Sequence, residues 1–184
     1  MINRIKGVLF LDSEAFNEIE HDEKANGQAA LIVIVASILA AIGVAFGPVI
    51  FSPGLAPTVS PILKFLGAAF WGVVAWLVWS AVTYFIGTKI FRGQATYGEM
   101  LRVIGFAYAP LSFLILSVIP CFGLLIALLA SAWAFAAVFI GVREGLDLDF
   151  GRTVVTVFFG WFVYAIGMGI LFSLFNIVSL SNIV

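Results

Sequence analysis

The chain has 184 residues, of which 63% are hydrophobic and 10% are charged, and its mean hydropathy is +1.18. A soluble domain would carry about a quarter charged residues, so the composition excludes one and predicts several apolar helices of ~20 residues, each able to cross a membrane. The net charge of −1 gives no indication of nucleic-acid binding. The single His21 and the single Cys121 exclude a His-based metal cage and an intrachain disulfide, and we expect neither a metal ion nor another cofactor.

Residues 1–26 are polar and acidic, which predicts a cytoplasmic amphipathic arm rather than a cleaved signal peptide. Residues 1–11 combine Arg4 and Lys6 with apolar residues. This mixture fits a helix in the headgroup region or, equally well, a loosely ordered terminus. Asp12 is a suitable N-cap for the helix that follows.

In that second helix, Phe16 and Ile19 share one face, and acids fill much of the remaining surface. We expect these acids to form a solvated face rather than a divalent-cation site, because they lack the spacing of a calcium-binding loop. We likewise expect His21 to lie at the surface. The acids of this face are Glu14, Glu18, Glu20, Asp22 and Glu23.

Residues 27–184 predict one transmembrane domain with five spans, so the fold class is all-α, a polytopic membrane protein preceded by an interfacial amphipathic helix. Gly43 and Gly47 in the first span form a small-residue pair that favours packing within the chain over dimerisation. The turns between spans include Ser52–Pro57 and Ile119–Gly123. The expected spans are about 28–51, 61–91, 97–118, 124–142 and 153–175.

Three tryptophans of the second span, Trp71, Trp76 and Trp79, lie deeper than the interface that Trp prefers. We therefore expect them to pack against other spans. The turn between the third and fourth spans is short, which requires these two spans to be antiparallel neighbours.

The basic residues predict the orientation in the membrane. Lys64 falls on one side, and the other eight bases fall on the opposite side together with every acid. The positive-inside rule then places the N-terminus in the cytoplasm and the C-terminus outside, and we expect a multi-pass protein of the cell membrane. The eight bases are Arg4, Lys6, Lys24, Lys89, Arg92, Arg102, Arg143 and Arg152.

Charged residues at the cytoplasmic mouth of the bundle are the principal candidate site. Glu99 and Arg102 stand three residues apart at the start of the third span, where a charge must be paired or hydrated. Arg143 and Glu144 end the fourth span on the same side. We expect a network of these four beside Tyr97, and we favour a structural clamp over a binding or proton-handling site.

Pro110 is the candidate hinge, because it removes a backbone hydrogen bond within the third span and can kink it. We expect its role to be structural. No nucleophile stands with a His inside the membrane, no Gly-rich phosphate loop occurs, and no span contains an Asp. We therefore expect no enzymatic activity and no catalytic residue.

The ordered motifs resemble the small prokaryotic form of the Yip (Ypt-interacting protein) family. They are Leu9-Phe-Leu-Asp-Ser-Glu-Ala-Phe16-x-x-Ile19 in the arm, Tyr97-Gly-Glu-x-Leu-Arg-Val-Ile-Gly-x-Ala-Tyr-Ala-Pro110, Ile119-Pro120 and Gly141-x-Arg143. Family members often have a Pro in the arm where this chain has Asp12-Ser13. The resemblance implies a five-helix bundle with a cytoplasmic N-terminus. Its eukaryotic members act in endoplasmic reticulum and Golgi trafficking and associate with prenylated Rab GTPases. They carry longer cytoplasmic N-terminal regions than the ~26 residues of this chain.

Three functions fit these features. The first is a non-enzymatic scaffold or adaptor that binds a protein or lipid partner at its cytoplasmic face, through the acidic arm and the charged mouth. The second is a small permease or channel with Glu99 as gate or proton site, and the third is a lipid-handling protein. Polar residues are scarce toward the outer face, which favours the adaptor. We expect contacts with membrane lipids and no nucleic acid, and the sequence leaves a homo-oligomer open.

Overall fold

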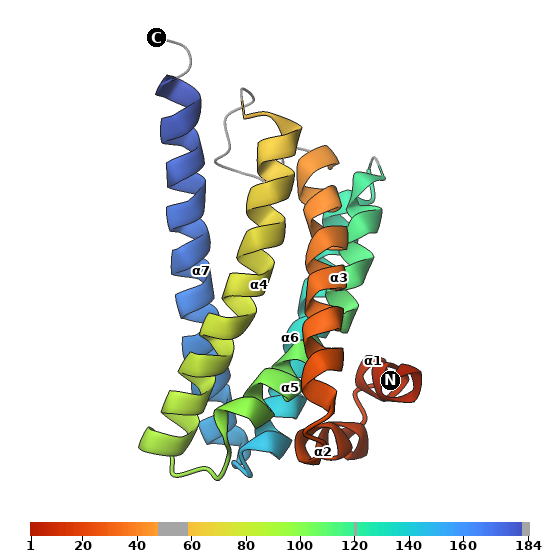
Figure 1. Cartoon of the computed structure of the whole chain (residues 1–184), viewed down its shortest axis with the longest axis vertical. Coiled ribbons are helices and arrows are strands. Elements are labelled where there is room, and N and C mark those ends of the chain that lie inside the picture. Colours follow the sequence, from red (N-terminus) through yellow and green to blue (C-terminus); the bar gives the residue numbers. More distant parts are fainter. Residues whose placement is uncertain (48–58, 120, 182–184) are drawn as a thin grey trace.

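The computed structural model describes residues 1–47, 59–119 and 121–181, and all regular secondary structure in these ranges is helical. Within them, five helical segments are long and apolar enough to cross a membrane, which confirms the predicted all-α class (Figure 1). The elements are α1 (Ile2–Leu9), α2 (Ser13–His21), α3 (Ala25–Phe46), α4 (Pro61–Phe85), the π-helical turn η2 (Ile86–Ile90), α5 (Tyr97–Ala107), the 3-10 segment η3 (Ala109–Val118), α6 (Gly123–Gly145) and α7 (Phe150–Ser181).

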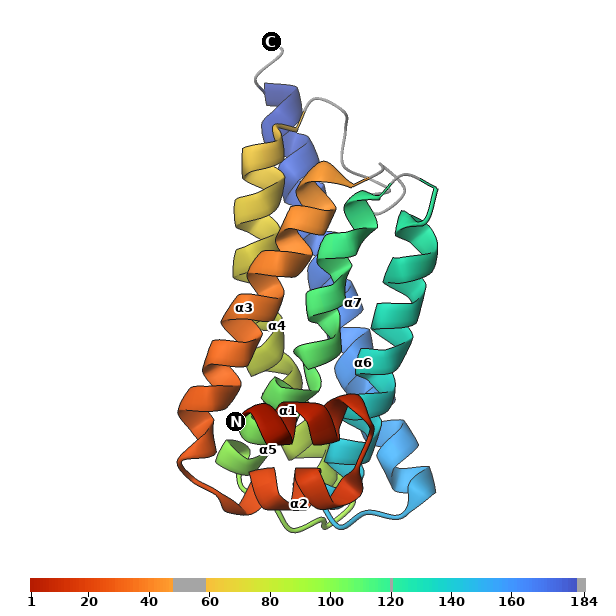
Figure 2. The same cartoon turned by 90° about the vertical axis from the view of Figure 1, so that its right-hand side faces the viewer.

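Helices α1 and α2 form the arm and lie across one end of the bundle, roughly perpendicular to its long helices (Figure 2). A Schellman motif ends α1: Leu11 has φ 59°, and its N–H donates to the Val8 carbonyl oxygen at 3.0 Å. Asp12 then caps α2, its side chain accepting from the N–H of Glu14 at 3.1 Å, as predicted. Residues 2–9 are thus helical, and the alternative of a loosely ordered terminus does not hold.

Salt bridges and burial hold the arm together and against the bundle. Arg4 pairs with Glu18 and Asp22 at 2.8 and 2.7 Å, which joins α1 to α2. Val8, Phe16 and Ile19 are fully buried. The Phe16 ring lies where Gly141 of α6 leaves room, since a Cβ there would come within 2.9 Å of the ring. Trp133 of α6 donates from Nε1 to the Leu9 carbonyl oxygen at 2.9 Å.

The small-residue pair of the first span packs within the chain, as predicted. A Cβ at Gly43 would meet the Leu114 carbonyl oxygen and the Ser117 hydroxyl of η3, so α3 and η3 approach closely there. Helix α3 ends at Phe46, with Gly47 as its C-cap. The turn predicted at Ser52–Pro57 and the predicted end of the span at Phe51 lie outside the described residues.

Helix α4 begins at Pro61, with the Ser60 side chain as its N-cap, and its tryptophans face other spans, as predicted. Trp76 donates from Nε1 to the Leu101 carbonyl oxygen of α5 at 3.0 Å. Helix α7 lies along α4 (Figure 1), where Trp71 and Trp79 face it. Pairing of the third and fourth spans is also confirmed, since η3 packs against α6 and Phe113 stacks on Trp133 at 5.6 Å.

Candidate functional site

Arg102 is a buried cation that ties the arm to the bundle. Its side chain projects from α5 and is 4% exposed. Its Nε donates to the backbone carbonyl oxygen of Glu20 at 3.1 Å, and its Nη2 donates to the same oxygen. Its Nη1 donates to Oδ1 of Asn26 at 3.3 Å. One guanidinium therefore joins α5 to the end of α2 and the start of α3, which the sequence did not indicate.

Glu99 has a local role at the start of α5. It forms a capping box with Thr96: the Glu99 N–H donates to the Thr96 hydroxyl at 3.2 Å, and the Thr96 N–H donates to Oε2 of Glu99 at 2.8 Å. The other oxygen, Oε1, lies 3.9 Å from Nη2 of Arg102. The pairing expected three residues apart is thus present, at the long end of ion-pair distances.

Glu20 corrects the sequence prediction, because its side chain is buried rather than part of the solvated face. The reason is periodicity: Glu20 stands four residues after Phe16 and one after Ile19, on the side of α2 that meets the bundle. Burial, with the charges of Glu99 and Asp147 nearby, raises the pKa of Glu20, while His21 and Arg102 oppose that shift. The position of Glu20 relative to Phe16 and Ile19 could therefore have predicted from the sequence that its side chain is buried.

His21 is exposed, as predicted. Its Nδ1 lies 2.9 Å from the carbonyl oxygen of Asn17, and this hydrogen bond, followed by the charge of Glu20, raises the pKa of the imidazole. Among the described residues, no three His, Cys, Asp or Glu side chains converge on a position that could hold a metal ion.

Arg143 and Glu144 lie at the same end of the bundle, but neither side chain forms an ion pair within the described residues. Their backbone carbonyl groups serve a Schellman motif, accepting from the N–H groups of Leu148 and Asp147, both at 3.2 Å. Tyr97 donates from its hydroxyl to the Leu77 carbonyl oxygen at 3.1 Å. A functional role for these residues stays a prediction.

Pro110 stands where the third span changes its helical form. Helix α5 ends at Ala107, and the 3-10 segment η3 starts at Ala109 and continues to Val118. A 3-10 run of ten residues is unusually long, and a proline at its start removes the N–H that an α-helix would use. Whether Pro110 acts as a moving hinge stays a prediction.

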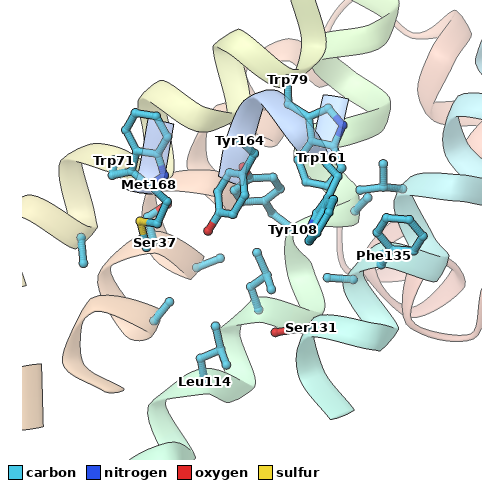
Figure 3. A pocket seen from close by; sticks show the side chains of 18 of the residues that line it. Ser37, Trp71, Trp79, Tyr108, Leu114, Ser131, Phe135, Trp161, Tyr164 and Met168 are labelled. Atoms are coloured by element: carbon cyan, nitrogen blue, oxygen red, sulfur yellow. The ribbon is translucent and has the colours of Figure 1, made fainter. Parts of the chain in front are cut away.

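A cavity of about 630 Å³, which the sequence did not indicate, lies among the spans (Figure 3). Side chains of α3, α4, η3, α6 and α7 line it, together with Ala107, the last residue of α5, and Tyr108, and most are Ala, Leu or aromatic. Its volume and apolar walls are those of a site for a small apolar molecule. Figure 3 places Trp79 and Tyr164 on one side, with Phe135 and Ser131 of α6 farther round the wall.

The wall formed by α4 and α7 is built from tryptophans that lie against glycines. Trp79 occupies the space beside Gly160, and Trp71 the space beside Gly167, because neither glycine has a Cβ. Tyr164 lies between the two indoles, with ring centroids 6.2 Å from Trp71 and 6.0 Å from Trp79. Aromatic side chains therefore separate α4 from α7 on the cavity side.

Three polar atoms on the cavity wall are buried without a hydrogen-bond partner among the described residues. They are Oγ of Ser37 and the indole Nε1 of Trp71 and of Trp79. A buried donor or acceptor left without a partner costs about 1–3 kcal/mol. These atoms are occluded within helix contacts: Oγ of Ser37 lies against Gly72, and Nε1 of Trp79 lies against Gly160.

An arm docked across one end of a bundle of five apolar helices defines a multi-pass helical membrane protein. Residues 6–174 match the family model described as Yip1 domain, and the chain belongs to that family. No curated protein and no solved structure is significantly similar to it.

Proposed function

We propose that the chain is a non-enzymatic adaptor of the cell membrane, which binds a protein or lipid partner at its cytoplasmic face. The observation that carries this proposal is the attachment of the arm: buried Arg102 binds the Glu20 carbonyl oxygen, and fully buried Phe16 and Ile19 anchor α2. A surface held in one conformation can bind a partner without the entropy loss of ordering a free tail.

The arm offers charged and apolar groups to a partner. Glu14 and Glu23 are exposed on and beside α2. Phe10 and Ile2, at the two ends of α1, are 85% and 66% exposed. A partner that carried basic side chains or headgroups beside an apolar surface would complement both features.

The orientation is part of the proposal. The arm, the loop after η2 and the connection between α6 and α7 lie at the same end of the bundle (Figure 1). Eight of the nine Lys and Arg residues belong to these segments or to the adjoining helix ends. The positive-inside rule supports a cytoplasmic location for this end and an outer location for the C-terminus.

The permease alternative depends on Glu99 as a gate or proton site. That carboxylate accepts from the Thr96 N–H and lies beside Arg102, so freeing it would break a helix cap. The deeper cavity has mostly apolar walls, which do not offer a continuous polar path. The Yip1 family is not known as enzymatic. The contacts of Glu99 and the apolar walls of the cavity support the adaptor over the permease.

Native mass spectrometry of the protein released from nanodiscs prepared without detergent tests this proposal. We expect a stoichiometric protein or lipid adduct, which the double charge reversal Glu14→Lys and Glu23→Lys weakens at least tenfold. Lys64→Glu is the control. Lys64 lies in the first turn of α4, at the end of the bundle remote from the arm (Figure 1), so this variant should retain the adduct. A wild-type chain with no adduct that the reversal at the arm weakens would overturn the proposal.

A further inference from the structure

We propose that the cavity among α3, α4, η3, α6 and α7 binds one hydrocarbon chain of a membrane lipid, which enters from the side between α6 and α7. This site is separate from the cytoplasmic surface of the proposed adaptor. Its lining residues lie along the middle of the helices and toward the end of the bundle remote from the arm. Ser37, for example, stands 12 residues into α3, or about 18 Å along it.

The side opening follows from how α7 packs. Helix α7 lies along α4 and approaches α6 beside their short connection, where Phe139 and Phe150 pack with ring centroids 5.3 Å apart. Farther along, Leu128 of α6 and Phe158 of α7 line the cavity yet are 60% and 53% exposed. Side chains that line a cavity and are also exposed on the lipid-facing side mark its opening to the bilayer.

The size of the cavity distinguishes a lipid chain from a helix of another protein. An α-helix with side chains is about 10 Å wide and rises about 5.4 Å per turn, so about 630 Å³ holds fewer than two turns of a helix. An extended hydrocarbon chain is much narrower and can thread between two helices. The surrounding bilayer supplies such chains at high concentration.

The chemistry of the walls also fits this occupant. The lining is mostly apolar, so water would bind poorly there. The polar atoms of Ser37, Trp71 and Trp79 are fully occluded, so the surface that a ligand meets in the cavity is mostly apolar, as a hydrocarbon chain requires. Few polar groups in an apolar pocket are typical of sites that orient a largely apolar ligand.

The first test is native mass spectrometry after purification from phosphatidylcholine membranes. We expect one phosphatidylcholine to remain bound per chain. Ala132→Phe and Ser131→Phe add bulk to the α6 wall and should lower the bound fraction at least tenfold. Gly169→Phe, at a position of α7 with no atom within 4 Å of an added Cβ, is the control and should retain the lipid.

The second test needs no variant that fills the cavity, and it uses two equally buried tryptophans. Trp76 and Trp79 are both 8% exposed, but of the two only Trp79 lines the cavity. In nanodiscs of phosphatidylcholine with brominated chains, bound lipid should quench Trp79. The quenched fraction of the fluorescence should therefore fall in Trp79→Phe and not in Trp76→Phe.

Three results would overturn the site. One is phosphatidylcholine retained equally by the wild type and both α6 variants, which would mean that the lipid binds to the perimeter of the bundle and not in the cavity. Another is no retained lipid, and the third is equal quenching of the two tryptophans. Loss of the partner adduct in the arm variants would leave these measurements unchanged, so the adaptor and the lipid site fail independently.

Discussion

The Arg102 side chain binds the backbone carbonyl oxygen of Glu20, a residue 82 positions earlier, from both Nε and Nη2. This contact joins the third span to the last turn of α2. Because the guanidinium is buried and always charged, it requires acceptors, and two of them are the Glu20 carbonyl oxygen of the arm and Oδ1 of Asn26 at the start of α3. The arm and the cation therefore stabilise each other.

We expect Glu99→Ala to destabilise the protein by about 1–2 kcal/mol, because it removes half of the capping box and the carboxylate beside Arg102. Glu23→Ala changes an exposed acid of the arm and should cost less than about 0.5 kcal/mol. Chemical unfolding in micelles measures both. Equal shifts in the unfolding midpoints would argue against a structural role for Glu99.

Glu20→Gln should stabilise the protein at neutral pH. Burial raises the pKa of Glu20 in the folded state, so the unfolded chain ionises first as pH rises, and ionisation of this residue disfavours folding above the ordinary Glu pKa of about 4.3. The advantage of the variant should thus be absent near pH 4 and present at pH 7, in unfolding curves recorded across that range.

Glu23→Gln is the control for removing one charge from the arm. A variant at Glu20 that is less stable than the wild type at pH 7, or whose advantage does not change with pH, would contradict this account of the buried carboxyl.

The packing of tryptophans against glycines between α4 and α7 predicts that Ala substitutions at three glycines of α7 differ in their effect on stability. Gly160→Ala and Gly167→Ala place a methyl group against Trp79 and Trp71, and overpacking of this kind costs about 1–3 kcal/mol. Gly169→Ala meets no atom within 4 Å and should be nearly neutral. Thermal unfolding in micelles compares them, and three equal midpoints would mean that the tryptophans do not pack as described.

Five spans place the two termini on opposite sides of the membrane. A reporter fused after residue 184 should therefore report the non-cytoplasmic side, and one fused before residue 1 the cytoplasmic side. A cytoplasmic signal at the C-terminus would contradict the five-span arrangement.

The sequence predicted those features that depend on local pattern. Long apolar runs predicted the five spans, and Asp12 predicted the start of α2 at the observed residue. The depth of Trp76 in its span correctly predicted a partner in another span. In each case the residue type is itself the signal, since hydropathy, capping and the interfacial preference of Trp are properties of single side chains.

The remainder depends on contacts that residue types do not encode. The partner of Arg102 is a backbone carbonyl group, which every residue has, and only the fold brings that of Glu20 to it. Four charged residues at one end suggested a network, but among the described residues only Glu99 and Arg102 of the four form an ion pair. The cavity depends on the packing of α7 along α4 rather than along α6, which hydropathy cannot predict.

The central claim is that Arg102 holds the arm on the bundle, and hydrogen–deuterium exchange of α2 in nanodiscs tests it most directly. We predict slow exchange of the Ser13–His21 amides in the wild type and at least tenfold faster exchange in Arg102→Ala, with the amides of α6 unchanged. Arg102→Lys, which keeps the charge but loses the paired donors, should give an intermediate rate. Rapid exchange of α2 in the wild type, or identical exchange in Arg102→Ala, would contradict the claim.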